Sequence, residues 1–369
     1  MEVTYCPDPS EGLETALRSV ASAASVEGVL LLSTPDPAVR SAAFESALAA
    51  VEVPVFGGIF PELVHEGERK ETGALVVGLP SEPAVTTVPS LSDDEASFGE
   101  VLDASLPAAG YETAFVFVDA HSSAVESFVD SLFRTYSVEL NFLGGGAGTL
   151  DADAEPCLFT DEGVIGDAAV VAAIPESVGV GVKHGWQEVA GPFRVTEAEG
   201  STLRALDGEP ALSVYSDVLD DAAGTAVDRE NFFEVAKSYP FGQTRMDGEQ
   251  IVRDPFSVDE AGAIDCFGEL PEGEFLTVLE GDPDSLVAAA QTAADNARAG
   301  VDSPAGIVCF DCISRVLYLE SAFDRELAAL TPDRLPVVGA LTIGEIANDG
   351  TGHLDYYNKT AVVGAIEGP

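Results

Sequence analysis

Short apolar runs alternate with amphipathic segments through the first half of the chain. Asp36 followed by Pro37 marks the start of a helix, and apolar residues between Val125 and Tyr136 recur with helical spacing. The intervening runs have the residue types of buried strands: residues 28–33, 53–58, 73–79 and 113–118. Strands and helices in this order pack as layers, so we expect an α/β fold with mixed β-sheets flanked by helices.

The strand signals lapse between about residues 175 and 200, which we interpret as a junction between two domains. Later in the chain, Asp282 and Pro283 open a helix with an alanine face that ends near Gly300, among further strand-like runs. We therefore expect two layered α/β domains, residues 1–185 and residues 186–369. No fixed-period repeat is apparent in the sequence.

The charge balance is strongly acidic, with 64 Asp and Glu against 17 Lys and Arg and a formal net charge of −47. Such self-repulsion weakens a compact fold in dilute buffer and is tolerated in concentrated salt, where the Debye length falls to about 3 Å at 1 M. The acidic residues are scattered and form no tail, which favours a halophilic protein over a nucleic-acid mimic. Binding to nucleic acid is not expected, since no basic patch exists to neutralise phosphates.

The N-terminal residues have neither a basic segment nor an apolar core of the secretory type, and no apolar run approaches the length that spans a bilayer. We therefore expect a cytoplasmic protein without membrane insertion. The five cysteines are dispersed and odd in number, which argues against a disulfide framework.

Three consecutive glycines, residues 144–146, follow an apolar run and are joined by Gly148. A phosphate-binding loop would need a lysine or a following helix, whereas residues 151–155 are acidic turn material. The cluster is therefore either a structural hairpin or a contact with a neutral or cationic ligand.

Other residues whose types could serve in catalysis or metal binding lack partner residues at a useful spacing. Cys309 and Cys312 lie in or at the end of an apolar strand, where residues three apart face opposite sides, so they suit neither zinc nor redox chemistry. Asp119 and His121 follow a strand, but no Gly-x-Ser-x-Gly element supplies a nucleophile. We expect no catalytic residues, no metal and no cofactor.

Seven short motifs follow one another along the chain. They are GGGAGT (144–149), LDGEPALSVYSDVL (206–219), YPFGQ (239–243), IVRDPFSVDEAGAIDCFGELPEG (251–273), CISR (312–315), VGALTIGEI (338–346) and YNKT (357–360). Taken in this order, they resemble the FIST family of sensory proteins. Departures from the family pattern are Thr149 in place of an acid, the absence of a Ser-Thr pair in residues 56–67, and Tyr357 in place of a histidine.

The resemblance implies a sensor that binds a small ligand, an amino acid or related metabolite, and relays to a separate signalling protein such as a kinase or chemotaxis component. Two alternatives remain open at this point. One is an adaptor that binds only protein, and the other is an enzyme that uses Cys312 as a nucleophile near His121.

The residue types in the matching motifs suit a zwitterionic ligand. Arg315 can clamp a carboxylate, Glu345 can accept an ammonium group, and Asn358 offers both a donor and an acceptor. Four further residues complete the expected ligand-binding set. Gly145, Gly146 and Gly344 would let the backbone approach the ligand closely, and Cys312 would turn its thiol to the pocket. Alternatively, Arg315 and Glu345 pair with each other and lock the C-terminal domain.

Overall fold

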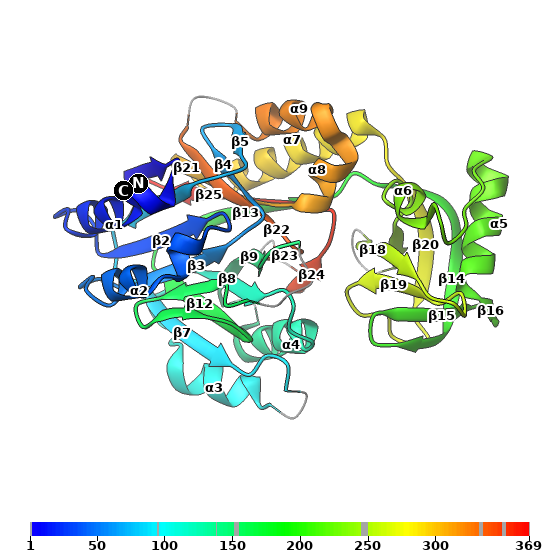
Figure 1. The fold of residues 1–369 in the computed structure, drawn as a ribbon, viewed down its shortest axis with the longest axis horizontal. Coiled ribbons are helices and arrows are strands. Elements are labelled where there is room, and N and C mark those ends of the chain that lie inside the picture. The colour runs from blue at the N-terminus through cyan, green and yellow to red at the C-terminus, as the bar shows by residue number, and fades with distance from the viewer. Residues whose placement is uncertain are drawn as a thin grey trace.

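The computed structural model describes residues 2–93, 96–137, 139–150, 155–244, 250–331, 335–348 and 352–368. It has a large body built from three six-stranded sheets and a smaller β-barrel that projects from one side (Figure 1). Each sheet of the body is mixed, and helices cover its outer face, so the expected α/β fold with mixed sheets and flanking helices is confirmed.

The body consists of three structural repeats with the same order of elements. The first repeat holds β1 (Glu2–Cys6), α1 (Pro9–Ala21), β2 (Gly28–Ser33), η1 (Pro37–Arg40), α2 (Ala42–Leu48), β3 (Val55–Ile59), β4 (Glu62–His65), β5 (Glu68–Lys70) and β6 (Ala74–Leu79). The second holds β7 (Ala84–Pro89), α3 (Phe98–Ser105), β8 (Thr113–Asp119), α4 (Val125–Tyr136), β9 (Asn141–Ala147), β10 (Leu158–Thr160), β11 (Gly163–Ile165) and β12 (Ala168–Ile174). The third holds β13 (Val178–Lys183), α7 (Pro283–Ala299), β21 (Pro304–Cys312), α8 (Ile313–Leu319), η2 (Glu320–Ala322), α9 (Phe323–Leu330), β22 (Val337–Thr342), β23 (Glu345–Ala347), β24 (Asp355–Tyr357) and β25 (Ala361–Glu367).

Each repeat gives a hairpin to the sheet of another repeat. The sheet orders are β1-β6-β2-β3-β10-β11, β7-β12-β8-β9-β23-β24 and β13-β25-β21-β22-β4-β5. Hairpin β4–β5 thus extends the third sheet, β10–β11 the first and β23–β24 the second. This cyclic exchange ties the three repeats into one body.

The repeats can be aligned on a glycine in the parallel strand pair of each sheet. Gly144 of β9 lies opposite Val116 of β8, and a Cβ there would come within 1.9 Å of the Val116 carbonyl oxygen. Gly57 and Gly339 occupy the same place in β3 and β22, and a Cβ there would collide in the same way with Leu31 and Cys309. Only glycine fits where the two parallel strands approach this closely.

The inner faces of the three sheets share an aromatic core. Phe56 of β3, Phe115 and Phe117 of β8, and Phe310 of β21 are fully buried with ring centroids 5.4–6.5 Å apart. On the outside, α1 and α2, α3 and α4, and α7 to α9 cover one sheet each (Figure 1). The body is therefore a three-sided prism with helices outermost.

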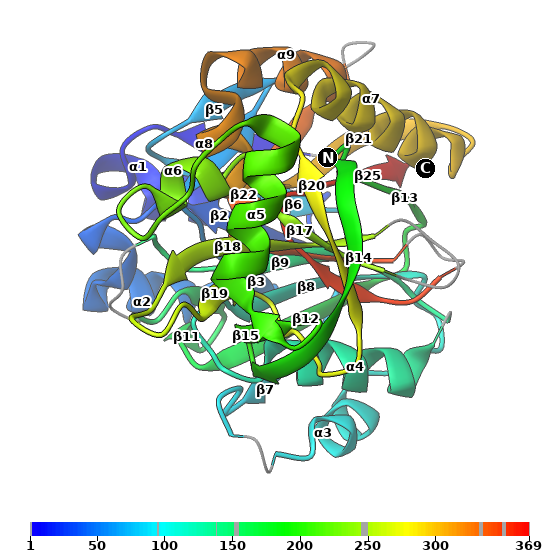
Figure 2. The same cartoon turned by 90° about the vertical axis from the view of Figure 1, so that its right-hand side faces the viewer.

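The barrel is inserted between β13 and α7 and closes because β14 pairs with both β20 and β15. Figure 2 looks onto the barrel, with α5 in front of it. Its elements are β14 (Gln187–Glu199), β15 (Thr202–Leu206), β16 (Glu209–Pro210), α5 (Ala211–Ala223), α6 (Phe232–Ala236), β17 (Phe241–Gln243), β18 (Ile251–Val258), β19 (Ile264–Phe267) and β20 (Phe275–Glu280). The domain division expected at residues 185 and 186 falls where the chain leaves the body for the barrel, and the chain returns to the body at α7.

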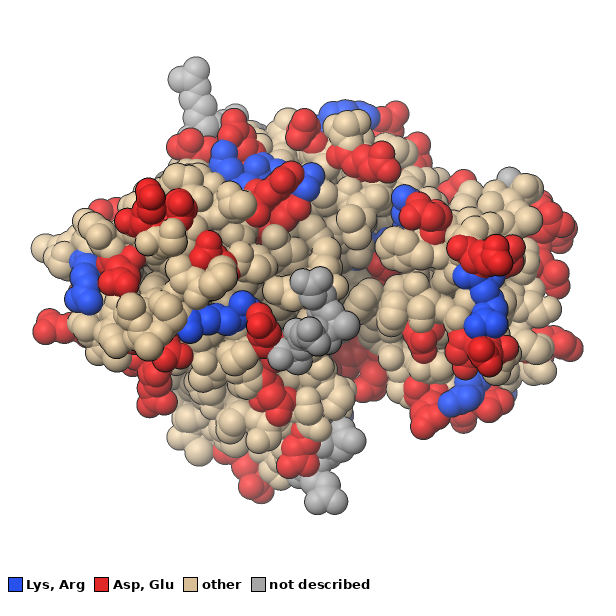
Figure 3. Space-filling model, viewed as in Figure 1, with Lys and Arg blue, Asp and Glu red and all other residues tan. Residues whose placement is uncertain are grey.

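Carboxylates are spread over most of the face in Figure 3, with few cationic groups among them. We expect the thermal unfolding midpoint to rise from dilute buffer to molar KCl, because added salt screens the repulsion among these groups. Thermal unfolding in a KCl series measures this. A sucrose series, which stabilises without screening charge, is the control. A midpoint that is flat in KCl would contradict the halophilic interpretation.

Candidate functional site

The residues of the C-terminal motifs meet where the body touches the barrel. Cys312 ends β21, Glu345 begins β23, and Asn358 and Lys359 lie between β24 and β25. Asp254 of β18 faces them from the barrel and pairs with Lys359. We call these five residues the junction site.

Glu345 is fully buried, and its carboxylate is held on both oxygens. The Thr342 hydroxyl donates to one oxygen at 2.9 Å, and the Thr360 backbone N–H donates to the other at 3.2 Å. The Cys312 thiol lies beside this carboxyl group and acts to lower its pKa. Burial outweighs these contacts and raises the pKa of Glu345 to about 8, so the group is largely protonated at neutral pH.

Cys312 is buried beside Glu345. Burial, followed by the charge on Glu345 and on Asp254, raises the pKa of the Cys312 thiol well above its usual range. The backbone groups of Lys359 and Ser314 act in the opposite direction and are outweighed. Cys312 is therefore a neutral thiol at physiological pH, not a thiolate.

Lys359 is the only one of the four lysines that is buried, and all four lie among the described residues. Its ammonium lies 3.2 Å from an Asp254 carboxylate oxygen, donates to the Lys237 carbonyl at 3.2 Å, and sits 5.1 Å from the centre of the Trp186 ring. Its backbone has a φ of +50°, a left-handed conformation that is uncommon for lysine. The ammonium thus bridges the body and the barrel.

Asn358 also reaches the barrel. Its amide donates to the carbonyls of Phe267 at 3.2 Å and Val252 at 3.5 Å, so it is engaged with barrel backbone in this structure. Next to it, Arg253 of the barrel forms a 3.0 Å ion pair with Glu126 of α4 and donates to the Tyr356 carbonyl at 3.1 Å. Polar contacts therefore surround the junction site on the barrel side.

Arg315 lies behind the junction site and is fully buried. Its Nε and one Nη donate to the two carboxylate oxygens of Glu326 at 2.8 and 2.6 Å. The remaining N–H groups donate to the carbonyls of His184, Lys359 and Leu286 at 2.6, 3.1 and 3.1 Å. All five donors are used within the protein, and the carboxylate partner of Arg315 is Glu326, not Glu345.

Asp311 completes the buried charge cluster, with its carboxylate 3.3 Å from Arg315 Nε. Burial, together with the charge on Glu326, raises the pKa of Asp311 well above its usual range. Arg315, Asp311 and Glu326 thus form one buried cluster of a single cation and two carboxyl groups.

Protein backbone fills the space beside the glycines of the expected ligand site. The Gly146 N–H donates to the Gly344 carbonyl at 2.9 Å, and the Ile343 N–H donates to the Gly146 carbonyl at 3.0 Å. A Cβ at Gly145 or Gly146 would lie 2.6 or 2.1 Å from the backbone of the Ile343–Gly344 turn. The cluster is thus part of strand β9 and admits this turn, while residues 151–154 of the acidic segment lie outside the described residues.

The other repeats indicate which polar residues the fold itself requires. In its sheet, Glu345 pairs with the residue that follows Gly144. In the other two sheets, Leu158 and Leu63 pair with the residues that follow Gly57 and Gly339. Both leucines are fully buried. A leucine therefore serves this position in two repeats, and the buried carboxyl group of the third is not needed for the architecture.

The sequence analysis expected Cys312, Glu345 and Asn358 to bind a ligand, which stays a prediction, and it did not single out their neighbours Lys359 and Asp254. These two residues stand in the motifs YNKT and IVRDPF, yet no spacing indicates that the two segments meet. Glu326 had a usable signal, because it interrupts the apolar stripe of α9 formed by Phe323, Leu327 and Leu330.

His121 and Asp119 lie elsewhere, in the second repeat. The His121 ring contacts the Thr149 carbonyl, and the Asp119 carboxylate accepts the backbone N–H groups of His121 and Asp167 at 3.1 and 2.7 Å. The contact partner of Cys312 is Glu345. Among the described residues, no group of His, Cys, Asp and Glu is arranged to hold a metal ion.

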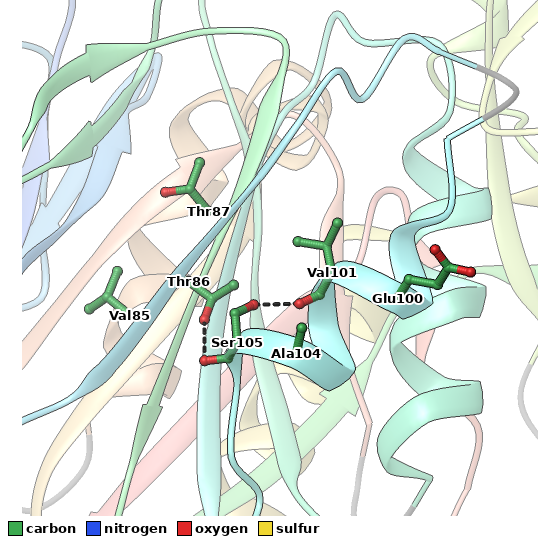
Figure 4. A pocket seen from close by; sticks show the side chains of 7 residues that line it. All are labelled: Val85, Thr86, Thr87, Glu100, Val101, Ala104 and Ser105. Carbon is green, nitrogen blue, oxygen red and sulfur yellow. Dashed lines mark hydrogen bonds between the residues drawn. The ribbon is translucent and has the colours of Figure 1, made fainter.

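Two open surface hollows lie away from the junction site. One, of about 540 Å³, lies between β7 and α3 and is lined by small or aliphatic side chains and Glu100 (Figure 4). Its two dashed contacts, Thr86 to the Ser105 carbonyl and Ser105 to the Val101 carbonyl, are internal to the protein. The other, of about 640 Å³, lies beside α5 and includes Arg229.

Comparison with known families gives two matches. The FIST N domain model matches residues 11–209, and the FIST C domain model matches residues 211–348. The search of curated proteins gives no match. In the part of the chain that the structure describes, every helix is too short or too polar to cross a membrane.

Proposed function

The chain belongs to the FIST family, a family of sensors in signal transduction, and on that premise we propose that it binds a small ligand at the junction site. The proposed ligand is an amino acid or a related metabolite. The proposed output is a separate signalling protein in the cytoplasm, such as a kinase or a chemotaxis component.

The observation that carries this proposal is the buried carboxyl group of Glu345 at a position where two other repeats have leucine. Burying a carboxyl group is unfavourable even when it is hydrogen-bonded, and the fold does not require one here. A group that is kept at such a position without an architectural need is a candidate for function.

The chemistry of the junction site suits a ligand with both charges. The Lys359 ammonium attracts a carboxylate, and the Glu345 carboxyl group can accept a hydrogen bond from an ammonium group. Asn358 supplies a donor and an acceptor beside them. The Cys312 thiol adds a small, polarizable contact next to Glu345.

Arg315 and the glycines have a supporting role in this proposal. Arg315 and the Trp186 indole both donate to the Lys359 carbonyl, at 3.1 and 3.0 Å, which fixes the backbone from which the ammonium projects. Gly145, Gly146 and Gly344 allow the turn before Glu345 to lie against β9. They would shape the site and leave direct recognition to the other residues.

A second candidate function is favoured by one feature, the Cys312 thiol next to the Glu345 carboxyl group. A carboxylate beside a thiol can act as its general base, and the thiolate can attack an electrophilic carbon. A screen for metabolite conversion tests this enzyme. Loss of turnover in Cys312→Ala would support it, and a conversion profile unchanged by Cys312→Ala would exclude it.

The sensor is tested by a thermal-shift screen in about 2 M KCl against amino acids, dipeptides and common metabolites. A ligand at 100 times its Kd is expected to add about 2.7 kcal/mol to the free energy of unfolding, which raises the midpoint. The shift should be lost in Glu345→Gln and kept in Glu62→Gln. Glu62 is the matched control, since it begins β4, the corresponding exchanged hairpin of the first repeat.

A screen in which the folded wild type responds to no compound would contradict the sensor. The adaptor that binds only protein would then become the favoured function. A shift that is equal in wild type and Glu345→Gln would place the ligand away from the junction site.

A further inference from the structure

The barrel is attached to the body mainly by polar contacts. Asp254 pairs with Lys359, Arg253 pairs with Glu126, and the Glu269 N–H donates to Glu126 at 2.9 Å. The covalent connections are the two short segments between β13 and β14 and between β20 and α7. Interfaces of this kind between domains permit relative motion more readily than large apolar ones.

The apolar cores of the barrel and the body also favour relative motion between them. The barrel has its own core around Tyr215, Phe241 and Ile264. Among the described residues, Val252 and Leu279 are the barrel residues that join a core cluster of the body, beside Trp186. The barrel can therefore tilt about this edge without exposing either main core.

Two partners of the Lys359 ammonium would move with the barrel, the Asp254 carboxylate of β18 and the Lys237 carbonyl. The Lys359 carbonyl is fixed to the body by Arg315, and Trp186 flanks the Lys359 ammonium at the edge of the barrel. Asp254 supplies the only carboxylate that pairs with this ammonium among the described residues. In the closed structure, Asp254 therefore stands where a carboxylate of a ligand would stand.

We propose that the barrel is a lid over the junction site, held shut by Asp254, and that a small carboxylate ligand opens it by taking the Lys359 ammonium in place of Asp254. The proposal rests on the proposed function for the ligand, whereas the lid itself can be tested without one. A ligand shifts this equilibrium because it binds the open state, in which Lys359 is available, better than the closed state.

Trp186, the only tryptophan of the chain, is a built-in reporter of opening. It is buried at the edge of the barrel, donates its indole N–H to the Lys359 carbonyl and packs against Tyr318 at 4.9 Å. Opening should shift its emission to longer wavelength and increase quenching by acrylamide, because the ring gains contact with water.

The test compares acrylamide quenching in wild type, Asp254→Asn and Asp265→Asn at constant KCl. Quenching is expected to rise several-fold in Asp254→Asn and to stay at the wild-type value in Asp265→Asn. Asp265 is the matched control, since its carboxylate accepts from Thr202 and Ser257 within the barrel. Equal quenching in all three proteins would overturn the lid.

Far-UV circular dichroism separates opening from global unfolding. If Asp254→Asn is unfolded, Glu126→Gln, which loosens the other ion pair of the interface, takes its place in the same comparison. Increased quenching in folded Glu126→Gln would support the lid, and wild-type quenching would overturn it.

Acetate serves as the simplest carboxylate probe. Replacing KCl with potassium acetate at equal ionic strength is expected to increase quenching in wild type but not in Lys359→Met, which lacks the ammonium. No response of the wild type to acetate would overturn the displacement of Asp254. The lid proposal and the sensor proposal are tested independently. Quenching in Asp254→Asn reports opening of the barrel even if the metabolite screen finds no ligand.

Discussion

Replacing Arg315 with alanine is expected to lower the free energy of unfolding by about 3 to 5 kcal/mol, the range for breaking a buried ion pair by removing one partner. The substitution leaves the Glu326 carboxylate buried without its cation and removes one donor from each of three backbone carbonyls. Urea unfolding in molar KCl measures the loss.

Arg325→Ala is the matched control, because Arg325 is exposed and pairs with Asp284 at the surface. That substitution should change stability by less than about 1 kcal/mol. Adding Glu326→Gln to an Arg315→Met protein should recover part of the loss, since no unpaired charge then remains. A loss of less than about 1 kcal/mol in Arg315→Ala would contradict the assigned role of the cluster.

Glu345→Gln is expected to remove a large pH dependence of stability. The pKa of Glu345 is raised from 4.5 to about 8 in the folded protein, chiefly by burial. The folded state therefore keeps a proton that the unfolded state releases, so this contribution to stability is complete below about pH 4.5 and is lost as the pH rises through about 8. The loss is on the order of a few kcal/mol.

The measurement is the difference in unfolding free energy between wild type and Glu345→Gln from pH 5 to about 9, which cancels the titration of the surface carboxylates. The groups that face Glu345 are Cys312, Tyr356, Asp311 and Arg315, and all remain in the variant. The difference should move in favour of Glu345→Gln with rising pH. A flat difference would mean that Glu345 is already ionised at neutral pH.

Much of the first half was predictable, because local patterns there agree with the final structure. The apolar runs at 28–33, 73–79 and 113–118 correspond to β2, β6 and β8, and the periodic segment from Val125 to Tyr136 is α4. Helix α7 begins at Pro283 next to the expected cap Asp282, whose side chain accepts the Ser285 N–H at 2.9 Å. Burial and capping act over a few residues, so they leave a signal in the sequence.

The repeats and the exchanged hairpins were not predictable in this way. The barrel separates β13 from α7 in the third repeat, so the sequence has no fixed period. Which sheet accepts a hairpin depends on packing between distant segments, as in the pairing of Glu345 with Gly145. The glycine run was recognised as a place of close approach, but its partner, the turn before Glu345, was not.

The site was partly predictable for the same reason. Residue types in the C-terminal motifs identified Glu345, Cys312 and Asn358, whereas the partners of Arg315 depend on α9 and on three separate carbonyls. Lys359 and Asp254 are far apart in sequence and become a pair only when the barrel docks on the body. Such a contact leaves no pattern in either segment.

Ligand binding at the junction site is tested most directly by a calorimetric titration of the strongest compound from the metabolite screen into wild type, Glu345→Gln and Glu62→Gln. We expect equal affinity for wild type and Glu62→Gln, and a loss of at least about tenfold, or 1.4 kcal/mol, for Glu345→Gln. Equal affinity in all three proteins would contradict binding at the junction site.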